Sequence, residues 1–210
     1  MSYSVKEIYF TLQGEGFHTG KHAVFCRFSG CNLWSGLEKN REKAICNFCD
    51  TDFVGTDGIN GNKYQNAESL AKKIDEIWDK NSNDKLVVFT GGEPLLQLNG
   101  ELIDLLHERK FKVAIETNGT ILPPKNIDWI CVSPKKGAEF NLDYGNEIKL
   151  VYPQEGLDPE EFQDFDFDHF FIQPMDGKDF QKNILQSVSY CIENPLWRLS
   201  LQTHKIMGID

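Results

Sequence analysis

The sequence contains no apolar run long enough to cross a membrane and no excess of positive charge. Its apolar runs are short, such as residues 86–89, whereas a membrane-spanning helix needs about 20 residues. The 210 residues carry 22 Lys and Arg against 32 Asp and Glu, a net charge of −10, and nucleic-acid-binding proteins usually present a basic surface. The opening residues, MSYSVKEIYF, also lack the charged and then apolar segments of a signal peptide. We therefore expect a cytoplasmic protein with neither a membrane nor a nucleic acid as its partner.

Repeats and low-complexity segments are also absent from the sequence. Apolar residues make up 40% of the chain and charged residues 26%, which is ordinary for a globular protein and argues against global disorder. The length suits a single domain over residues 1–210 with a sizeable core. The polar stretch 32–65, rich in Gly, Asn, Lys and Asp, is predicted to be a loop or a small insertion.

Short apolar segments alternate with helical patterns through most of the chain. Helical spacing predicts helices over 67–80, from Pro94 to about Arg109, and over 178–193, while the acidic segment 155–168 is predicted to be a solvated turn or short helix. Near-continuous apolar strands separated by helices indicate a parallel α/β sheet. Because only three good helices accompany about six strands, we predict an incomplete, open (β/α) barrel with mostly parallel strands. The strands are expected at 23–28, 86–90, 111–116, 129–133, 147–151 and 169–173, with a further candidate at 198–204.

Nearly all of these strands end in a polar residue. In a parallel barrel the C-terminal strand ends meet on one face, and binding sites are built there. One polar residue at a strand end is ordinarily a cap or turn residue, but five in one chain favour a shared pocket. The five are Thr90, Glu116, Ser133, Gln173 and His204.

The cysteines are the strongest sign of chemistry in the sequence, and they lie at positions 26, 31, 46, 49, 131 and 191. In a chain of this length without a secretion signal, metal ligation is favoured over disulfides. Cys46 and Cys49 can grip one metal centre, and Cys31, separated from Cys46 by 14 residues, can complete it. Three thiolates leave one iron of a [4Fe-4S] cluster open, whereas zinc would need a fourth ligand, for which the candidates are Cys26, His18 and His22. Alternation places Cys26 on an apolar strand face, and the spacing alone favours a cluster over zinc only slightly.

A second signal follows the strand at 86–90, where the sequence reads Gly91-Gly92-Glu93-Pro94. Glycines at this point let the backbone approach a ligand closely, and Glu93 offers a carboxylate to a cation. Alone, the segment is equally compatible with a tight turn and a proline at a helix start.

Together, the three cysteines and the Gly91–Glu93 segment resemble the radical S-adenosylmethionine (SAM) enzymes. In that superfamily three cysteines hold a [4Fe-4S] cluster, the open iron binds the amino and carboxylate groups of SAM, and the GGE segment contacts the amino group. Phe48, directly before Cys49, matches the aromatic residue that lies near the adenine. The usual spacing is Cys-x3-Cys-x2-Cys, so residues 32–45 are expected to form an expanded cluster loop.

Within the superfamily, the chain resembles the family of 7-carboxy-7-deazaguanine synthases. The resemblance implies a carbon–nitrogen lyase that converts 6-carboxy-5,6,7,8-tetrahydropterin to 7-carboxy-7-deazaguanine with loss of ammonia, on the route to queuosine and related deazapurines. It also implies SAM, a [4Fe-4S] cluster and Mg²⁺ as cofactors, a flavodoxin-like electron donor and a homodimer. The matching segments are Phe10–Gly16, Arg27–Cys31, Cys49–Thr51, Thr90–Pro94, Glu116–Gly119, Ser133–Lys135, Gln173–Asp176 and Gln202–His204.

The resemblance assigns roles residue by residue, with the radical supplied by the cofactor and no catalytic side chain. The cluster ligands are expected to be Cys31, Cys46 and Cys49. Substrate contacts are expected at Leu12, Gln13, Gly14, Glu15, Arg27, Thr90, Glu116, His204 and Asp210, the last through a terminal carboxylate. SAM contacts are expected at Phe48, Gly92, Glu93, Ser133, Pro134, Lys135, Gln173, Pro174, Met175 and Asp176.

Two of these assignments also have a basis in general chemistry. Arg27 alternates with Cys26, so it should face the barrel interior, where a guanidinium suits a bidentate bond to a carboxylate; a structural ion pair is the alternative. For Mg²⁺, coordination chemistry nominates the carboxylates of Asp50 and Asp52, whereas the resemblance nominates the Thr51 hydroxyl, which we adopt.

Two other functions compete with this prediction. One is a different radical SAM enzyme, such as an activase that makes glycyl radicals on a partner protein. The other is a non-catalytic zinc-binding module. Anaerobically purified protein would be brown with a cluster and colourless with zinc.

Overall fold

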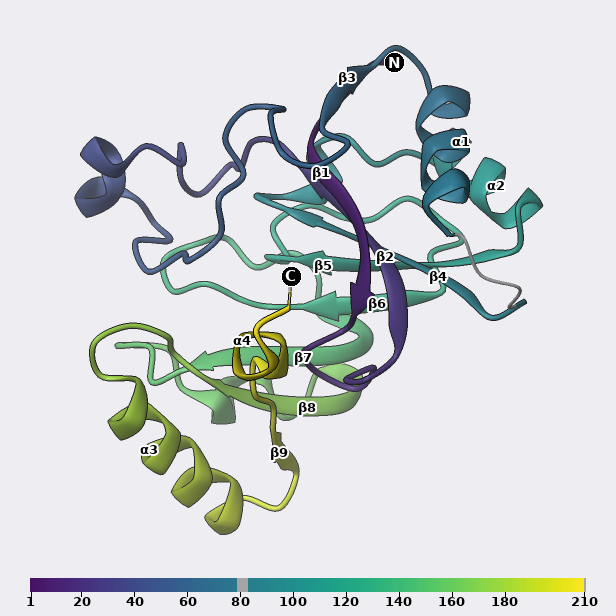
Figure 1. Ribbon diagram of the computed structural model, residues 1–210. Helices are drawn as coiled ribbons and strands as arrows, with labels where there is room; N and C mark the ends of the chain where they lie inside the picture. The colour runs from purple at the N-terminus through teal and green to yellow at the C-terminus, as the bar shows by residue number, and fades with distance from the viewer. Residues whose placement is uncertain (79–82, 210) are drawn as a thin grey trace.

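The computed structural model describes residues 1–78 and 83–209 and consists of one curved sheet with helices on its outer side (Figure 1). In this part of the chain the sheet has nine strands in the order β3-β1-β2-β4-β5-β6-β7-β8-β9. β2 and the strands β4 to β9 run parallel to one another, whereas β1 is antiparallel to both β2 and β3. The two edges do not pair, so the predicted open, mostly parallel barrel is confirmed. The strands are β1 Tyr3–Leu12, β2 His22–Phe28, β3 Asn62–Tyr64, β4 Lys85–Gly91, β5 Phe111–Thr117, β6 Trp129–Val132, β7 Tyr144–Tyr152, β8 Asp166–Pro174 and β9 Trp197–Leu199.

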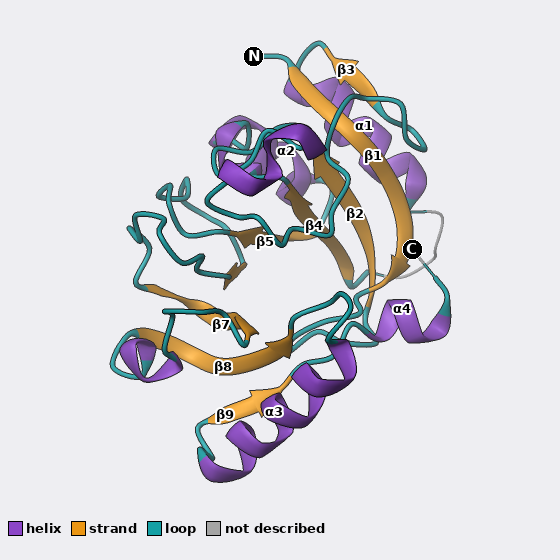
Figure 2. Ribbon diagram, turned by 90° about the vertical axis from the view of Figure 1, so that its left-hand side faces the viewer, coloured by secondary structure: helices purple, strands orange, loops and turns teal. Residues whose placement is uncertain are grey.

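Three helices cover the convex face of the sheet. α1 (Ala67–Ile77) and α2 (Gly100–Glu108) lie over one half, and α3 (Phe180–Glu193) lies over the other (Figure 2). The side chains of Asn66 and Asn99 cap α1 and α2 by accepting backbone N–H groups of their first turns, which fixes where each helix begins. No helix in the described residues is both long and apolar enough to span a membrane.

Strand alternation separates an apolar outside from a mixed inside. Outward side chains of β1, β2, β4 and β5 pack with α1 and α2 in one core, and those of β6 to β8 pack with α3 in a second. Inward side chains form a small apolar layer of Ala23, Leu86, Val88 and Ala114. As predicted, Cys26 faces the outer core and is fully buried, whereas Arg27 faces the interior.

The final predicted strand is wrong beyond Leu199. β9 ends at that residue, and Thr203–Met207 form the short helix α4, so His204 lies near a helix start rather than at a strand end. The predicted helix from Pro94 to Arg109 is interrupted, because Pro94–Leu96 form the 3-10 turn η2 and Asn99 caps a new helix.

Other boundaries agree with the sequence pattern. α1 begins at Ala67 as predicted, and the last two positions of its predicted range 67–80 lie outside the described residues. The acidic segment 155–168 contains the 3-10 helix η3 (Pro159–Phe162), and the loop 32–45 contains another, η1 (Glu38–Lys43). The pattern did not predict β1 or β3.

Candidate active site

A cavity of about 590 Å³ lies on the inner side of the curved sheet. The five polar residues predicted to share a pocket all line it, including His204 despite its helical setting. Of the predicted site residues that the structure describes, all line the cavity except Glu93 and Pro134. Asp210 lies outside the described residues, so its role stays a prediction.

Three thiols form a cysteine wall (Cys31, Cys46 and Cys49) on the loop between β2 and β3, and Phe48 lines the cavity beside them. The backbone N–H of Leu33 donates to the Cys31 sulfur over 3.4 Å. A hydrogen bond with Cys46 lowers the pKa of Cys49 to about 6, while the same bond raises the pKa of Cys46. Three thiols that line one cavity, two of them accepting backbone N–H groups, fit the ligand set of an iron–sulfur cluster with one open iron. Among the described residues, no three His, Cys, Asp or Glu side chains are grouped to hold a single metal ion.

The remaining cysteines lie apart from this wall. Cys26 is in the outer core, Cys191 is on α3, and Cys131 is buried on the inner side of β6. Burial raises the pKa of all three thiols, as expected for structural cysteines.

The Gly91–Glu93 segment packs against Gly30 and Cys31, at the base of the cysteine wall. A Cβ added to Gly92 would lie 2.2 Å from the Gly30 carbonyl oxygen and 2.6 Å from the Cys31 Cβ, so only glycine lets the two segments touch. The fully buried Glu93 carboxylate accepts 2.8 Å bonds from the Thr117 hydroxyl and the Asn118 N–H. In this structure Glu93 therefore joins β4 to β5 below the cavity surface, and its predicted contact with SAM stays a prediction.

A buried lysine joins two acidic residues at the base of the cavity. The Lys149 ammonium lies 2.5 Å from Glu15 Oε2 and 2.8 Å from Glu116 Oε2, and we refer to these three residues as the carboxylate floor. Burial alone would raise the pKa of Glu15, but the Lys149 charge and hydrogen bonds hold it at about 2. Glu15 therefore presents ionised oxygens, which accept hydrogen bonds and donate none.

The turn between β1 and β2 carries Glu15 and reaches across the interior to the second half of the sheet. Phe17 stacks on Trp129 and on His169, at ring distances of 5.0 and 4.3 Å, and these two rings also stack on each other. The Phe17 N–H donates to the buried Glu147 carboxylate over 2.8 Å. The segment after β9 holds the same turn, because the Thr203 N–H donates to the Gly14 carbonyl over 2.9 Å. Both sides of the barrel thus fix the position of the turn.

Arg27 is held by two neighbours on β1. Its Nε donates to Glu7 Oε1 over 2.7 Å, and its Nη2 donates to the Tyr9 hydroxyl over 3.1 Å. The ion pair that was the alternative reading of Arg27 is therefore present. It uses the Nε side of the guanidinium, and Arg27 still lines the cavity.

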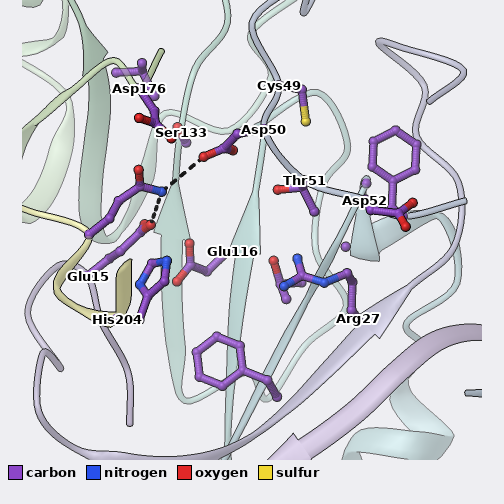
Figure 3. A pocket seen from close by; sticks show the side chains of 18 of the residues that line it. Glu15, Arg27, Cys49, Asp50, Thr51, Asp52, Glu116, Ser133, Asp176 and His204 are labelled. Carbon is purple, nitrogen blue, oxygen red and sulfur yellow. Dashed lines mark hydrogen bonds between the residues drawn. The ribbon is translucent and has the colours of Figure 1, made fainter. Parts of the chain in front are cut away.

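Thr51 lies between two aspartates that lysines already engage (Figure 3). Lys205 binds Asp50 at 2.6 Å, and Lys6 binds Asp52 at 2.8 Å. Lys205 also contacts Asp176 at 2.5 Å, so α4 ties the residue after Cys49 to the segment that follows β8. In addition, the Gln202 amide donates to both Glu15 and Asp50, as the dashed lines in Figure 3 show.

Sequence reasoning missed several of these residues. Lys149 interrupts an otherwise apolar strand, EIKLV, and a lysine at the centre of a buried strand was an available signal. Lys205 and Glu7 gave no such signal, because isolated charges on a helix or a strand are usually solvated.

The fold and the cysteine wall together define a radical SAM domain. Residues 41–204 match the family described as the Radical SAM superfamily. That superfamily uses SAM and a [4Fe-4S] cluster, which agrees with the three thiols on one cavity wall.

Similarity to individual proteins places the chain in one family within this superfamily. The chain is 58% identical over 209 residues to 7-carboxy-7-deazaguanine synthase of Caulobacter vibrioides, with 100% of both chains covered. It is 40% identical over 211 residues to the enzyme of the same name from Bacteroides thetaiotaomicron, again with 100% of both covered. The crystal structure of QueE from Escherichia coli matches with a TM-score of 0.70 and 26% identity, over 96% of this chain and 94% of that one. This chain therefore belongs to the 7-carboxy-7-deazaguanine synthase family.

Proposed function

We propose that this chain converts 6-carboxy-5,6,7,8-tetrahydropterin to 7-carboxy-7-deazaguanine and ammonia, as a Mg²⁺-dependent carbon–nitrogen lyase. The observation that carries the proposal is the cavity itself, in which a guanidinium, an acceptor floor and a cysteine wall occur together. Arg27 suits a carboxylate at one end of the substrate, and Glu15 and Glu116 suit the N–H groups of a 2-amino-4-oxopterin edge.

These residues give the protein and the cofactor different roles in the proposed reaction. Cys31, Cys46 and Cys49 would hold the cluster, which together with SAM would supply radical chemistry at C6 of the substrate. The side chains of the chain bind and orient the substrate by its two ends, so that one carbon faces the cysteine wall. Ser133, Lys135, Gln173 and Asp176 are proposed to hold SAM on the remaining side.

We propose the Thr51 hydroxyl as the protein ligand of Mg²⁺, with substrate oxygens and waters completing its coordination. Lysine ammonium groups already pair with both flanking carboxylates, so a cation bound there would have to displace them, which supports the Thr51 hydroxyl as the ligand. Thr51→Ala is expected to weaken the Mg²⁺ dependence of turnover, whereas Thr51→Ser, which keeps the hydroxyl, is expected to retain it. A Mg²⁺ titration of initial rates, with iron content as the control, measures this. An unchanged titration in Thr51→Ala would place the ion elsewhere.

The activity test uses the reconstituted, anaerobic enzyme with the tetrahydropterin, SAM and a chemical reductant. Formation of 7-carboxy-7-deazaguanine, identified by mass, and stoichiometric ammonia are expected. Brown, cluster-loaded protein that cleaves SAM but leaves the pterin unchanged would refute the substrate assignment. Production of a glycyl radical on an added protein would instead support the activase alternative.

The cellular setting is proposed from the family alone. A flavodoxin-like protein is proposed to supply the electron, the enzyme is proposed to work as a homodimer in the cytoplasm, and its product is proposed to enter queuosine or related deazapurine synthesis.

A further inference from the structure

Lys149 occupies an unusual position for a charged side chain. It lies in the middle of β7, with Ile148 and Leu150 facing the outer core on either side, and its side chain is only 4% exposed. A lone ammonium at such a site would be strongly disfavoured by the loss of water. Its presence therefore depends on the two carboxylates that it contacts.

The contacts form a symmetrical cradle around the cation. Lys149 takes one oxygen of each carboxylate, Oε2 of Glu15 and Oε2 of Glu116. A glutamine amide takes the other oxygen of each: Gln202 Nε2 donates to Glu15 Oε1, and Gln13 Nε2 donates to Glu116 Oε1, both over 2.9 Å. Every carboxylate oxygen thus has one donor and retains a second lone pair for a ligand.

We propose that Lys149 is a positioning residue that keeps the Glu15 and Glu116 carboxylates ionised and directed into the cavity. The two carboxylates then accept hydrogen bonds only and select a heterocycle edge made of N–H donors. The inference rests on the proposed function for the identity of that heterocycle. Without the Lys149 cation, the two half-buried carboxylates that face it would repel each other, and one of them would take up a proton. A protonated carboxyl donates a hydrogen bond, and it would then meet an N–H donor of the ligand.

The charge balance supports this role. The pKa of Lys149 lies well above its usual value, because Glu116 and Glu15 outweigh the effect of burial. The ammonium is therefore held as a fixed cation rather than as a base. The other titratable groups that act on the floor are Cys131, Lys135, Glu147 and His204.

The experiment measures binding of 6-carboxypterin, a stable aromatic analogue, to the cluster-loaded enzyme with SAM. Lys149→Met is expected to weaken binding about 10- to 100-fold near neutral pH, with iron content and SAM affinity unchanged. Its dissociation constant is expected to fall as pH rises from about 6 to 7.5, as the shared proton leaves, whereas wild type changes little. Lys149→Arg, which keeps the charge, is expected to recover most of the affinity.

The matched control is Lys112→Met, a strand lysine whose side chain is 64% exposed, and it is expected to bind like wild type. If Lys149→Met does not fold, Lys149→Gln, which is neutral but retains N–H donors, takes its place in the same titration. Equal affinity and an equal pH profile in wild type and the neutral variant would overturn the role of Lys149. Failure of wild type itself to bind the analogue would instead overturn the proposed substrate, and this inference with it.

Discussion

Replacing any one of Cys31, Cys46 and Cys49 by alanine is expected to abolish both the iron–sulfur absorbance and turnover. Each thiol lines the same cavity, and the cluster needs all three because one iron must stay open for SAM. Loss of one ligand exposes a second iron to solvent, so the cluster is expected to be lost during purification. Visible absorbance, iron and sulfide content, and SAM cleavage measure the effect.

The other cysteines provide matched controls. Cys191→Ala removes a half-buried thiol on α3, far from the wall in the fold, and should keep the full cluster content. Cys26→Ala removes a fully buried thiol, which is expected to cost about 1 kcal/mol of stability and a few degrees of melting temperature while the cluster is retained. A folded Cys26→Ala protein without its cluster would contradict the three-ligand assignment.

Arg27→Gln is expected to raise KM for the tetrahydropterin about 10- to 100-fold. The change removes charge-assisted bonds worth about 1.5–3 kcal/mol to the substrate carboxylate. It also leaves the Glu7 carboxylate without its cation, so binding of a second carboxylate nearby becomes less favourable still. Initial rates over a range of substrate concentrations, together with equilibrium binding of 6-carboxypterin, measure the change.

A control for the loss of charge is Arg198→Gln. Arg198 is exposed and stacks on Phe171, outside the cavity lining, so its replacement should leave KM unchanged. Arg27→Lys should recover only part of the affinity, because an ammonium cannot reproduce the planar fork. If Arg27→Gln binds the analogue as tightly as wild type, the guanidinium serves only its ion pair with Glu7.

The parallel part of the fold was predictable because each strand is a short, continuous apolar run. Residues 86–90 and 111–116 gave β4 and β5 within a residue, and alternation at Cys26 and Arg27 gave the inner and outer faces. The strand ends at Thr90, Glu116, Ser133 and Gln173 predicted the shared cavity, because parallel strands bring their C-terminal ends together. His204 lines the same cavity from α4.

Features made by long-range contacts were not predictable in this way. β1 begins with an irregular pattern of buried and half-buried residues and depends on pairing with β2 and β3. Thr203–Met207 read as an extension of a strand because five residues are too few to show helical spacing. Lys149 was visible as an anomaly in its strand, but its two partners lie 134 and 33 residues away in the sequence.

The turn between β1 and β2, which the segment after β9 holds in place, has a consequence for the order in which the site forms during synthesis. Its bonds to Ser200, Gln202 and Thr203 join residues 184, 187 and 189 positions apart. At about 5–20 residues per second, a ribosome needs on the order of 10–40 s between the two segments. The thiols at 31, 46 and 49 emerge early in that interval, long before the base of their cavity exists. Cluster insertion into the finished pocket is therefore expected to follow translation, after the most distant contacts of the chain have formed.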